Sequence, residues 1–261
     1  MIKKYGILLS FLNLFLFVCV LIVNFLATYL PLNGKSTGEL SDLYPNLIVP
    51  AGITFSIWGI IYIFLAIFVI YNIIKAIKDS EFFTKTININ LLFALTSILN
   101  ICWIFAWHYL KITISLIIMI LFLISLTFIF LLQKKLESKN RLSFFYKVPI
   151  EIYFGWITIA TIVNTTAFLV HIGWNGFGLT PQLWTIIMIL VGGIICIIML
   201  NKYNAIAYSL VIIWAFTGII IKRSSSKVVY NEIIITSFII ILFILINIIK
   251  NIYFLKKNKH N

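Results

Sequence analysis

The sequence predicts an all-α protein that crosses a membrane as a bundle of about eight helices. Of its 261 residues, 62% are hydrophobic and only 10% are charged, and the mean hydropathy is +1.12. The apolar residues gather in long runs, and a run of about 18 or more indicates a transmembrane helix. Lysines and arginines lie between the runs, so membrane topology explains the net charge of +13 better than nucleic acid as a partner.

Eight apolar runs divide the chain. The first run follows two lysines, as the apolar part of a signal peptide would. It is longer than the about 7–15 residues of such a segment and lacks a small-residue cleavage site, so we interpret it as a retained helix. In order, the runs are Ile7–Leu30, Ala51–Ile74, Ile89–Trp107, Ile112–Leu132, Val148–Leu169, Leu183–Leu200, Ala205–Ile221 and Ile233–Ile249.

Basic residues between the runs predict the orientation of the bundle, because lysine and arginine accumulate on the cytoplasmic side. With the N-terminus inside, most of the 20 basic residues fall in inner segments. We therefore expect both termini in the cytoplasm and the protein in a bacterial cell membrane, in contact with lipid. The basic residues left in outer loops are Lys35, Lys111, Lys222, Arg223 and Lys227.

Two outer segments differ from short connecting turns. The segment from Pro31 to Pro50 is long and contains three prolines, which is typical of a lid or a binding loop. The segment from Val170 to Gln182 carries His171 and Trp174. We interpret it as an interfacial turn with an anchoring tryptophan, and a second flap is the alternative.

The second apolar run opens with an aromatic stripe. Pro50 suits the first turn of a helix, where its missing N–H costs nothing. Phe55, Trp58 and Tyr62 then follow at positions i, i+3 and i+7, which places them on one helical face. Such a stripe is often a lipid-facing belt or a packing surface. Other helices carry polar groups at the same depth. These groups make a ligand pocket the alternative to a lipid-facing or packing stripe.

Asparagine side chains lie in the outer half of the first and third runs. Asn24 is near the outer end of the first run, and Asn100 shares one helical face with Trp103 and Trp107. An amide in hydrocarbon is costly unless it finds a partner, so such residues face other helices or a cavity. Bonding between helices, worth about 0.6–2 kcal/mol for each bond, is the alternative to a pocket.

The fifth run repeats this pattern. Trp156, Ala160 and Asn164 follow at i, i+4 and i+8 and share one face. A small residue between a tryptophan and an asparagine lets a backbone or a flat ligand come close. A concave, mainly apolar site with a few polar groups is typical of a small-molecule pocket. We therefore favour a pocket in the outer half of the bundle.

Three motifs in order resemble those of the TspO/MBR family, the tryptophan-rich sensory or translocator proteins. Pro50-x-x-x-x-Phe55-x-x-Trp58-x-x-x-Tyr62 resembles the opening of its second helix. Leu99-Asn100 with the aromatic residues that follow resembles its third helix. Pro149 with Trp156-Ile-Thr-Ile-Ala160-Thr-Ile-Val-Asn164 resembles its fifth. The resemblance covers about residues 1–170 and implies a five-helix core.

The resemblance also implies a function. The family binds porphyrins and haem in a pocket under the loop between helices 1 and 2, and sensing, transport and light-dependent porphyrin breakdown have been proposed for it. We expect a sensor or carrier without a required cofactor, with haem or porphyrin as ligand. A membrane transporter and a porphyrin-modifying enzyme are the alternatives. The expected ligand-binding residues are Pro50, Phe55, Trp58, Tyr62, Asn100, Trp103, Trp156, Ala160 and Asn164.

The chain departs from the family pattern in its first loop and in its added C-terminal helices. The Trp-Tyr pair and the Lys-Pro of the family's first loop are replaced, and Leu43-Tyr44-Pro45 is the nearest match. Residues 171–261 add about three helices and a basic tail to the core. We interpret these helices as a packing, shielding or oligomerisation surface, which leaves a homodimer open, and completion of a transport pathway is the alternative.

Catalytic chemistry is not indicated by the sequence. We find no paired carboxylates, no nucleophile next to a histidine, no metal-ligand spacing and no phosphate-binding loop. Glu151 lies near the inner end of the fifth run. His171 could bind a haem iron, but a single interfacial histidine is more often only solvated. We therefore expect no enzymatic activity and no metal site.

Overall fold

The computed structural model describes residues 2–30, 32–137 and 142–257, and these contain helices but no strands. Eight of the helices are long and apolar enough to cross a membrane, which confirms the predicted class. Pro31, the first residue of the predicted loop, lies outside the described residues. The elements are α1 (Ile2–Tyr29), η1 (Leu32–Gly34), α2 (Thr37–Asp42), η2 (Gly52–Ser56), α3 (Ile57–Lys78), α4 (Ser80–His108), α5 (Ile112–Glu137), α6 (Phe144–His171), η3 (Gly176–Gly178), α7 (Pro181–Tyr203), α8 (Ile206–Ser224) and α9 (Asn231–Lys257).

The prediction that Pro50 occupies the first turn of a membrane helix is wrong. Ala51 is the N-cap of the short 3-10 helix η2, and the α-helix α3 begins only at Ile57. The backbone N–H of Ala51 donates to the carbonyl oxygen of Gly218 in α8, at 2.9 Å. A partner far along the chain therefore fixes the backbone where local sequence suggests an α-helical start, and Phe55 lies in the 3-10 turn.

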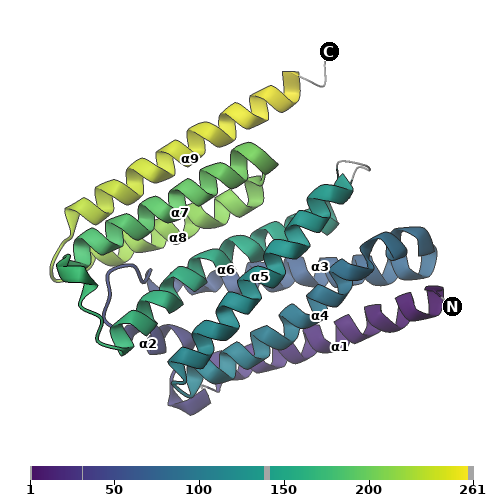
Figure 1. Cartoon of the computed structure of the whole chain (residues 1–261), viewed down its shortest axis with the longest axis horizontal. Coiled ribbons are helices and arrows are strands. Elements are labelled where there is room, and N and C mark those ends of the chain that lie inside the picture. Colours follow the sequence, from purple (N-terminus) through teal and green to yellow (C-terminus); the bar gives the residue numbers. More distant parts are fainter. Residues whose placement is uncertain (1, 31, 138–141, 258–261) are drawn as a thin grey trace.

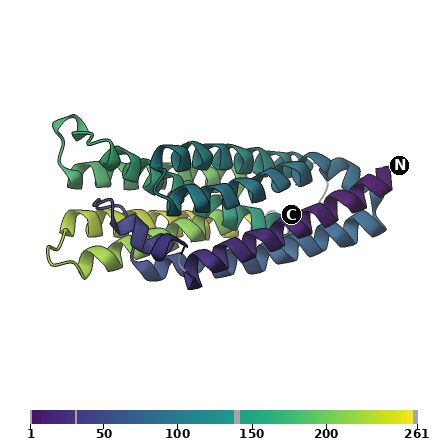
Figure 2. The ribbon, with the colours of Figure 1, turned by 90° about the horizontal axis from the view of Figure 1, so that it is seen from below.

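Five long helices form a closed ring. α1 contacts α3 and α4, α6 contacts α3 and α5, and α4 contacts α5, which gives the ring order α1, α3, α6, α5, α4. The two ribbon views show these helices running side by side (Figure 1, Figure 2). α1, α3, α4 and α5 each bury one face against their neighbours and leave another for lipid. α6 also packs against α8, and all its residues from Val148 to Ile159 are buried. This ring is the five-helix core that the motifs predict.

The last three long helices form a second group beside the ring. α7, α8 and α9 contact one another, and α8 packs along α6 (Figure 1). Gly155 makes the approach of α6 to α8 close, since a Cβ atom there would lie 2.9 Å from the carbonyl oxygen of Tyr208. The hydroxyl of Tyr208 donates to that of Thr158 at 3.1 Å. The C-terminal helices are thus joined to the core through α6 and α8.

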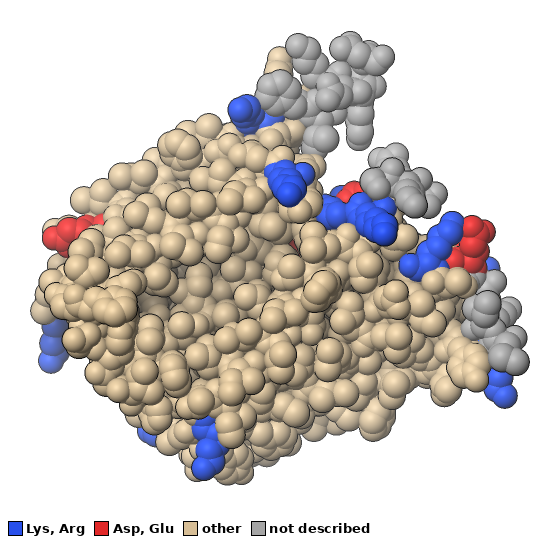
Figure 3. All heavy atoms as spheres, in the orientation of Figure 1, with Lys and Arg blue, Asp and Glu red and all other residues tan. Residues whose placement is uncertain are grey.

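The start of α1 and the end of α9 lie at the same end of the bundle (Figure 1). Charged side chains gather toward the two ends of the face shown in Figure 3, with a wide uncharged surface between them. This is the arrangement of a protein whose middle contacts lipid tails. We call the end that holds the start of α1 the inner end, and its assignment to the cytoplasm stays a prediction.

Candidate functional site

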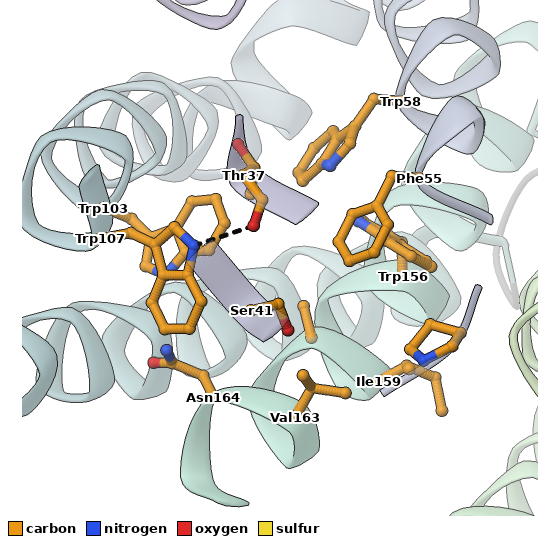
Figure 4. Close-up of a pocket in the computed structure, with 12 residues that line it drawn as sticks. Thr37, Ser41, Phe55, Trp58, Trp103, Trp107, Trp156, Ile159, Val163 and Asn164 are labelled. Atoms are coloured by element: carbon orange, nitrogen blue, oxygen red, sulfur yellow. Dashed lines mark hydrogen bonds between the residues drawn. The ribbon is translucent and has the colours of Figure 1, made fainter. Parts of the chain in front are cut away.

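A small cavity lies at the outer end of the ring, under the short helix α2. Its volume is about 30 Å³, which is room for about two water molecules at 10–15 Å³ each. Figure 4 shows the side chains that surround it, four of them tryptophans. The cavity is lined by Thr37, Ser41, Pro50, Phe55, Trp58, Trp103, Trp107, Trp156, Ile159, Ala160, Val163 and Asn164.

Aromatic rings from four elements make the walls of this cavity. Trp156 of α6 meets Trp58 of α3 edge to face, with ring centroids 6.1 Å apart. Phe55 of η2 meets Trp156 in the same way at 5.8 Å. On the opposite side, Trp103 and Trp107 of α4 stack at 6.0 Å. The i, i+4 spacing in α4 and the packing of α3 on α6 therefore bring the indoles of separate motifs to one depth.

Two of these tryptophans have an unused hydrogen-bond donor. The indole Nε1 atoms of Trp103 and Trp156 are buried and have no hydrogen-bond partner. A buried donor without a partner costs about 1–3 kcal/mol, so such groups are uncommon in the interior of a protein. Both side chains line the cavity, so an acceptor atom of a bound molecule would pair with groups that the protein leaves unsatisfied.

The short helix α2 is held over the cavity by its own capping residues and by contacts with α4. Ser36 and Glu39 form a capping box, in which the Ser36 N–H donates to the Glu39 carboxylate at 2.7 Å. This bond, followed by the bond from the Ser36 hydroxyl, lowers the pKa of the Glu39 carboxyl. At the other face, Trp107 Nε1 donates to the Thr37 carbonyl at 3.3 Å, and the His108 Nε2 lies 3.1 Å from the Thr37 hydroxyl. The outer end of α4 therefore holds α2 in place.

The C-terminal helix α8 holds the same region from the other side. The Trp214 Nε1 donates to the carbonyl oxygen of Thr54 at 2.9 Å, and Lys222 pairs with Asp42 of α2 at 2.5 Å. Gly218 faces η2 so closely that a Cβ atom there would overlap the Thr54 hydroxyl. Helices predicted to lie outside the core thus contact the loop that covers the cavity.

Seven of the nine expected ligand-binding residues line the cavity, and two do not. Asn100 is fully buried, accepts a hydrogen bond from Asn24 at 2.7 Å and donates one to the Tyr153 hydroxyl at 3.2 Å. It joins α1, α4 and α6, which is the helix-bonding alternative considered for it. Tyr62 stacks on Trp58, with ring centroids 5.5 Å apart, and lines a neighbouring groove instead.

Asn164 is placed at the cavity by α5. Its amide nitrogen lies 3.1 Å from the hydroxyl of Ser115, and its amide oxygen lies 3.3 Å from the same hydroxyl. Sequence reasoning missed Ser115, as well as Thr37 and Ser41 of α2. Short hydroxyl side chains are common in transmembrane helices and loops, and only the folded arrangement shows which of them meet.

A groove of about 770 Å³ adjoins the cavity. It lies between the outer ends of α1 and α3, beside α2, and shares Thr37, Pro50, Phe55 and Trp58 with the cavity. Small-molecule sites usually have volumes of about 300–1,000 Å³. The cavity alone is far too small for a tetrapyrrole, and the groove is large enough. The rings of Phe55 and Trp58 thus line both spaces.

A metal centre is not formed by the described part of the chain, where no three histidine, cysteine or acidic side chains come together. His171, the residue considered for a haem iron, packs edge to face on Tyr44 with ring centroids 6.1 Å apart and lines neither space. The site therefore offers ring surfaces and indole donors to a flat molecule, and no histidine to an iron atom.

One protein-family model, described as TSPO-like protein, matches residues 10–250. The match includes α7, α8 and most of α9, and so extends beyond residue 170, where the resemblance seen in the motifs ends. No curated protein and no solved structure shows significant similarity to the chain.

Proposed function

The chain belongs to the TSPO-like family, and from this premise we propose that it binds a flat hydrophobic ligand between its outer-half tryptophans. The ligand class is a porphyrin, a haem-like tetrapyrrole or a related planar molecule. The protein acts as a sensor or a carrier, and its mechanism is binding rather than chemistry. The two unpaired indole donors, Trp103 Nε1 and Trp156 Nε1, are the observation that supports this most directly.

Binding requires the cavity and the adjoining groove to join. The cavity of about 30 Å³ cannot hold a macrocycle, whereas the groove of about 770 Å³ can. Trp58 stands between them and is half-buried, so a change of its side-chain rotamer connects the two spaces. The ligand ring then stacks on the indoles, and such aromatic pairs contribute about 0.5–1.5 kcal/mol beyond the apolar area they bury.

The outer rim of the groove supplies charge. Lys222, Asp42 and Glu39 all line it. Lys222 is paired with Asp42, and its ammonium group keeps N–H donors for an acidic side chain of a tetrapyrrole while the apolar ring lies deeper. Two carboxylates lie beside this one cation, so the rim would hold such a side chain by hydrogen bonding to Lys222 and not by net positive charge.

The test is a titration of the purified protein with protoporphyrin, followed by tryptophan fluorescence quenching. Trp156→Phe removes the indole N–H but keeps an aromatic ring, and Trp174→Phe is the matched control in the outer turn. We expect saturable micromolar binding that Trp156→Phe weakens about tenfold and Trp174→Phe leaves unchanged. Absence of binding, or equal binding by both variants at equal thermal stability, would contradict the proposal.

Transport is the second candidate function, and the contacts of α8 support it. α8 joins the C-terminal helices to the loop over the cavity through Trp214 and Lys222, so movement of those helices would move the cover of the site. If the protein is a carrier, we expect saturable porphyrin flux into proteoliposomes. Binding without flux would favour the sensor function. Consumption of the porphyrin under light and oxygen would indicate the enzymatic alternative.

A further inference from the structure

A second groove, separate from the candidate pocket, lies in the inner half of the molecule. Its volume is about 560 Å³ and its lining is almost entirely apolar. It extends along α8 from Ile206 to Trp214, which is about 12 Å at 1.5 Å per residue. The groove is lined by Ile57, Ile60, Phe64, Phe144, Lys147, Val148, Glu151, Ile152, Asn204, Ile206, Ala207, Leu210, Val211 and Trp214.

The groove has a floor of buried residues and an open side. α6 contacts both α3 and α8 and supplies the floor, where Val148 and Ile152 are buried. At the edges, the side chains of Ile60, Leu210 and Phe144 are at least half exposed. These edges belong to membrane-spanning helices, so the open side faces the hydrocarbon of the bilayer. A molecule that enters from there is a membrane component.

The inner end of the groove carries polar groups. Lys147 bonds to Glu137 at 2.9 Å, while Lys134 bonds to Glu137 at 3.2 Å and to Glu151 at 3.1 Å. An ammonium group has three N–H donors, so one bond leaves Lys147 two for another partner. The two carboxylates, in contrast, are already paired.

Asn204 supplies a second unused group at this end. It ends α7 in the left-handed conformation, with φ of 50°, and its backbone N–H bonds to Leu200. Its side-chain Oδ1 is buried and has no hydrogen-bond partner. The mouth of the groove therefore combines an ammonium donor on α6 with an amide acceptor after α7, both beside an apolar channel.

We propose that this groove binds one anionic phospholipid with a hydroxyl-bearing headgroup, from the leaflet at the inner end. One acyl chain lies along α8 between Ile60 and Leu210. The phosphate accepts hydrogen bonds from Lys147, and a headgroup hydroxyl donates to the Asn204 Oδ1. Basic groups at the inner ends of membrane helices are known to hold anionic headgroups. A choline headgroup has no hydroxyl to donate and bears a positive charge near Lys147, so it fits the mouth less well.

The first test measures headgroup preference. The full-length protein is purified in detergent and supplied with phosphatidylglycerol or phosphatidylcholine of identical acyl chains, and bound lipid is counted by native mass spectrometry. We expect one phosphatidylglycerol per chain, retained several-fold better than phosphatidylcholine. Lys147→Gln removes the preference, Lys147→Arg keeps it, and Lys78→Gln at the inner end of α3 leaves it unchanged. An unaltered preference in Lys147→Gln would overturn the headgroup assignment.

The second test fills the channel. Leu210 is 52% exposed at the groove, and Leu131 of α5 is 41% exposed at a similar depth outside it. Leu210→Trp should abolish retention of both lipids, whereas Leu131→Trp should not. Retention of the lipid by a folded Leu210→Trp protein would overturn the proposal. Porphyrin binding is a separate readout, so failure of the proposed function does not affect either test.

Discussion

Trp214 of α8 donates its indole N–H to the carbonyl oxygen of Thr54 in η2, at 2.9 Å, across 160 positions of the chain. Thr54 lies in the turn that leads into α3, next to Phe55 of the candidate pocket. This bond attaches the C-terminal helices to the segment that shapes the pocket wall. Together with the Ala51–Gly218 backbone bond, it makes α8 a structural part of the candidate site.

Trp214→Phe should lower the stability of the protein and loosen η2. The substitution keeps an aromatic ring but leaves the Thr54 carbonyl without its donor, and a lost hydrogen bond of this kind costs about 0.5–1.5 kcal/mol. Thermal unfolding in detergent measures the loss, with Trp174→Phe as the control because no hydrogen bond of its indole is present in the described structure. Equal melting temperatures for the two variants would contradict the role given to Trp214.

Gly218→Ala should be more damaging than the same change elsewhere. The new Cβ atom would overlap the Thr54 hydroxyl, and overpacking of this kind costs about 1–3 kcal/mol. Gly59→Ala is the control, since nothing lies within 4 Å of a Cβ atom there and alanine favours the helix. The expected result is a lower melting temperature for the first variant only, together with altered porphyrin affinity.

Asn100→Leu should destabilise the bundle through its helix contacts. The change removes the bonds to Asn24 and Tyr153, each worth about 0.6–2 kcal/mol in a membrane. Asn72→Leu is the control, because the Asn72 amide donates within its own helix, to Phe68. Unfolding measurements should separate the two variants. A change in porphyrin affinity at unchanged stability would instead return Asn100 to the ligand-binding set.

Low pH should loosen α2. The pKa of Glu39 is lowered from its ordinary value of 4.5 by the Ser36 backbone and hydroxyl donors. A lowered pKa means that the ionised capping box stabilises α2 fully above about pH 4.5, and that this contribution disappears as pH falls through the lower folded value. Hydrogen exchange of residues 36–43, corrected for intrinsic rates, should therefore accelerate below that pH. Glu39→Gln keeps a capping side chain without the charge and should flatten the dependence.

The membrane architecture was predictable because it depends on composition over long windows. A run of about 20 apolar residues specifies a spanning helix whatever packs against it. The start of α3 was not predictable in this way. Pro50 is suited to a helix start, but the Ala51 N–H finds its partner in α8, and local sequence carries no signal of a contact with Gly218.

The candidate site was likewise predictable only in part. Trp58, Trp103 and Trp156 come from motifs whose depth and face follow from helical spacing, and they line the cavity. Asn100 and Asn164 occupy similar positions by helical spacing, and both bond to side chains of other helices, yet only Asn164 also lines the cavity. Which amide reaches the cavity depends on the ring order of the core helices. That order is set by tertiary packing, as is the approach of α8.

Trp214 also lines the inner-half groove, and its indole bonds to Thr54, the neighbour of Phe55, so one side chain links the inner-half groove to the segment beside the candidate pocket. If lipid in the groove fixes its indole, the two equilibria are thermodynamically linked. Reciprocity then requires that the lipid change the affinity for porphyrin by the same factor as porphyrin changes the affinity for the lipid. On the two proposals together, the composition of the surrounding leaflet would set the affinity of the protein for porphyrin, and Trp214→Phe would uncouple the two.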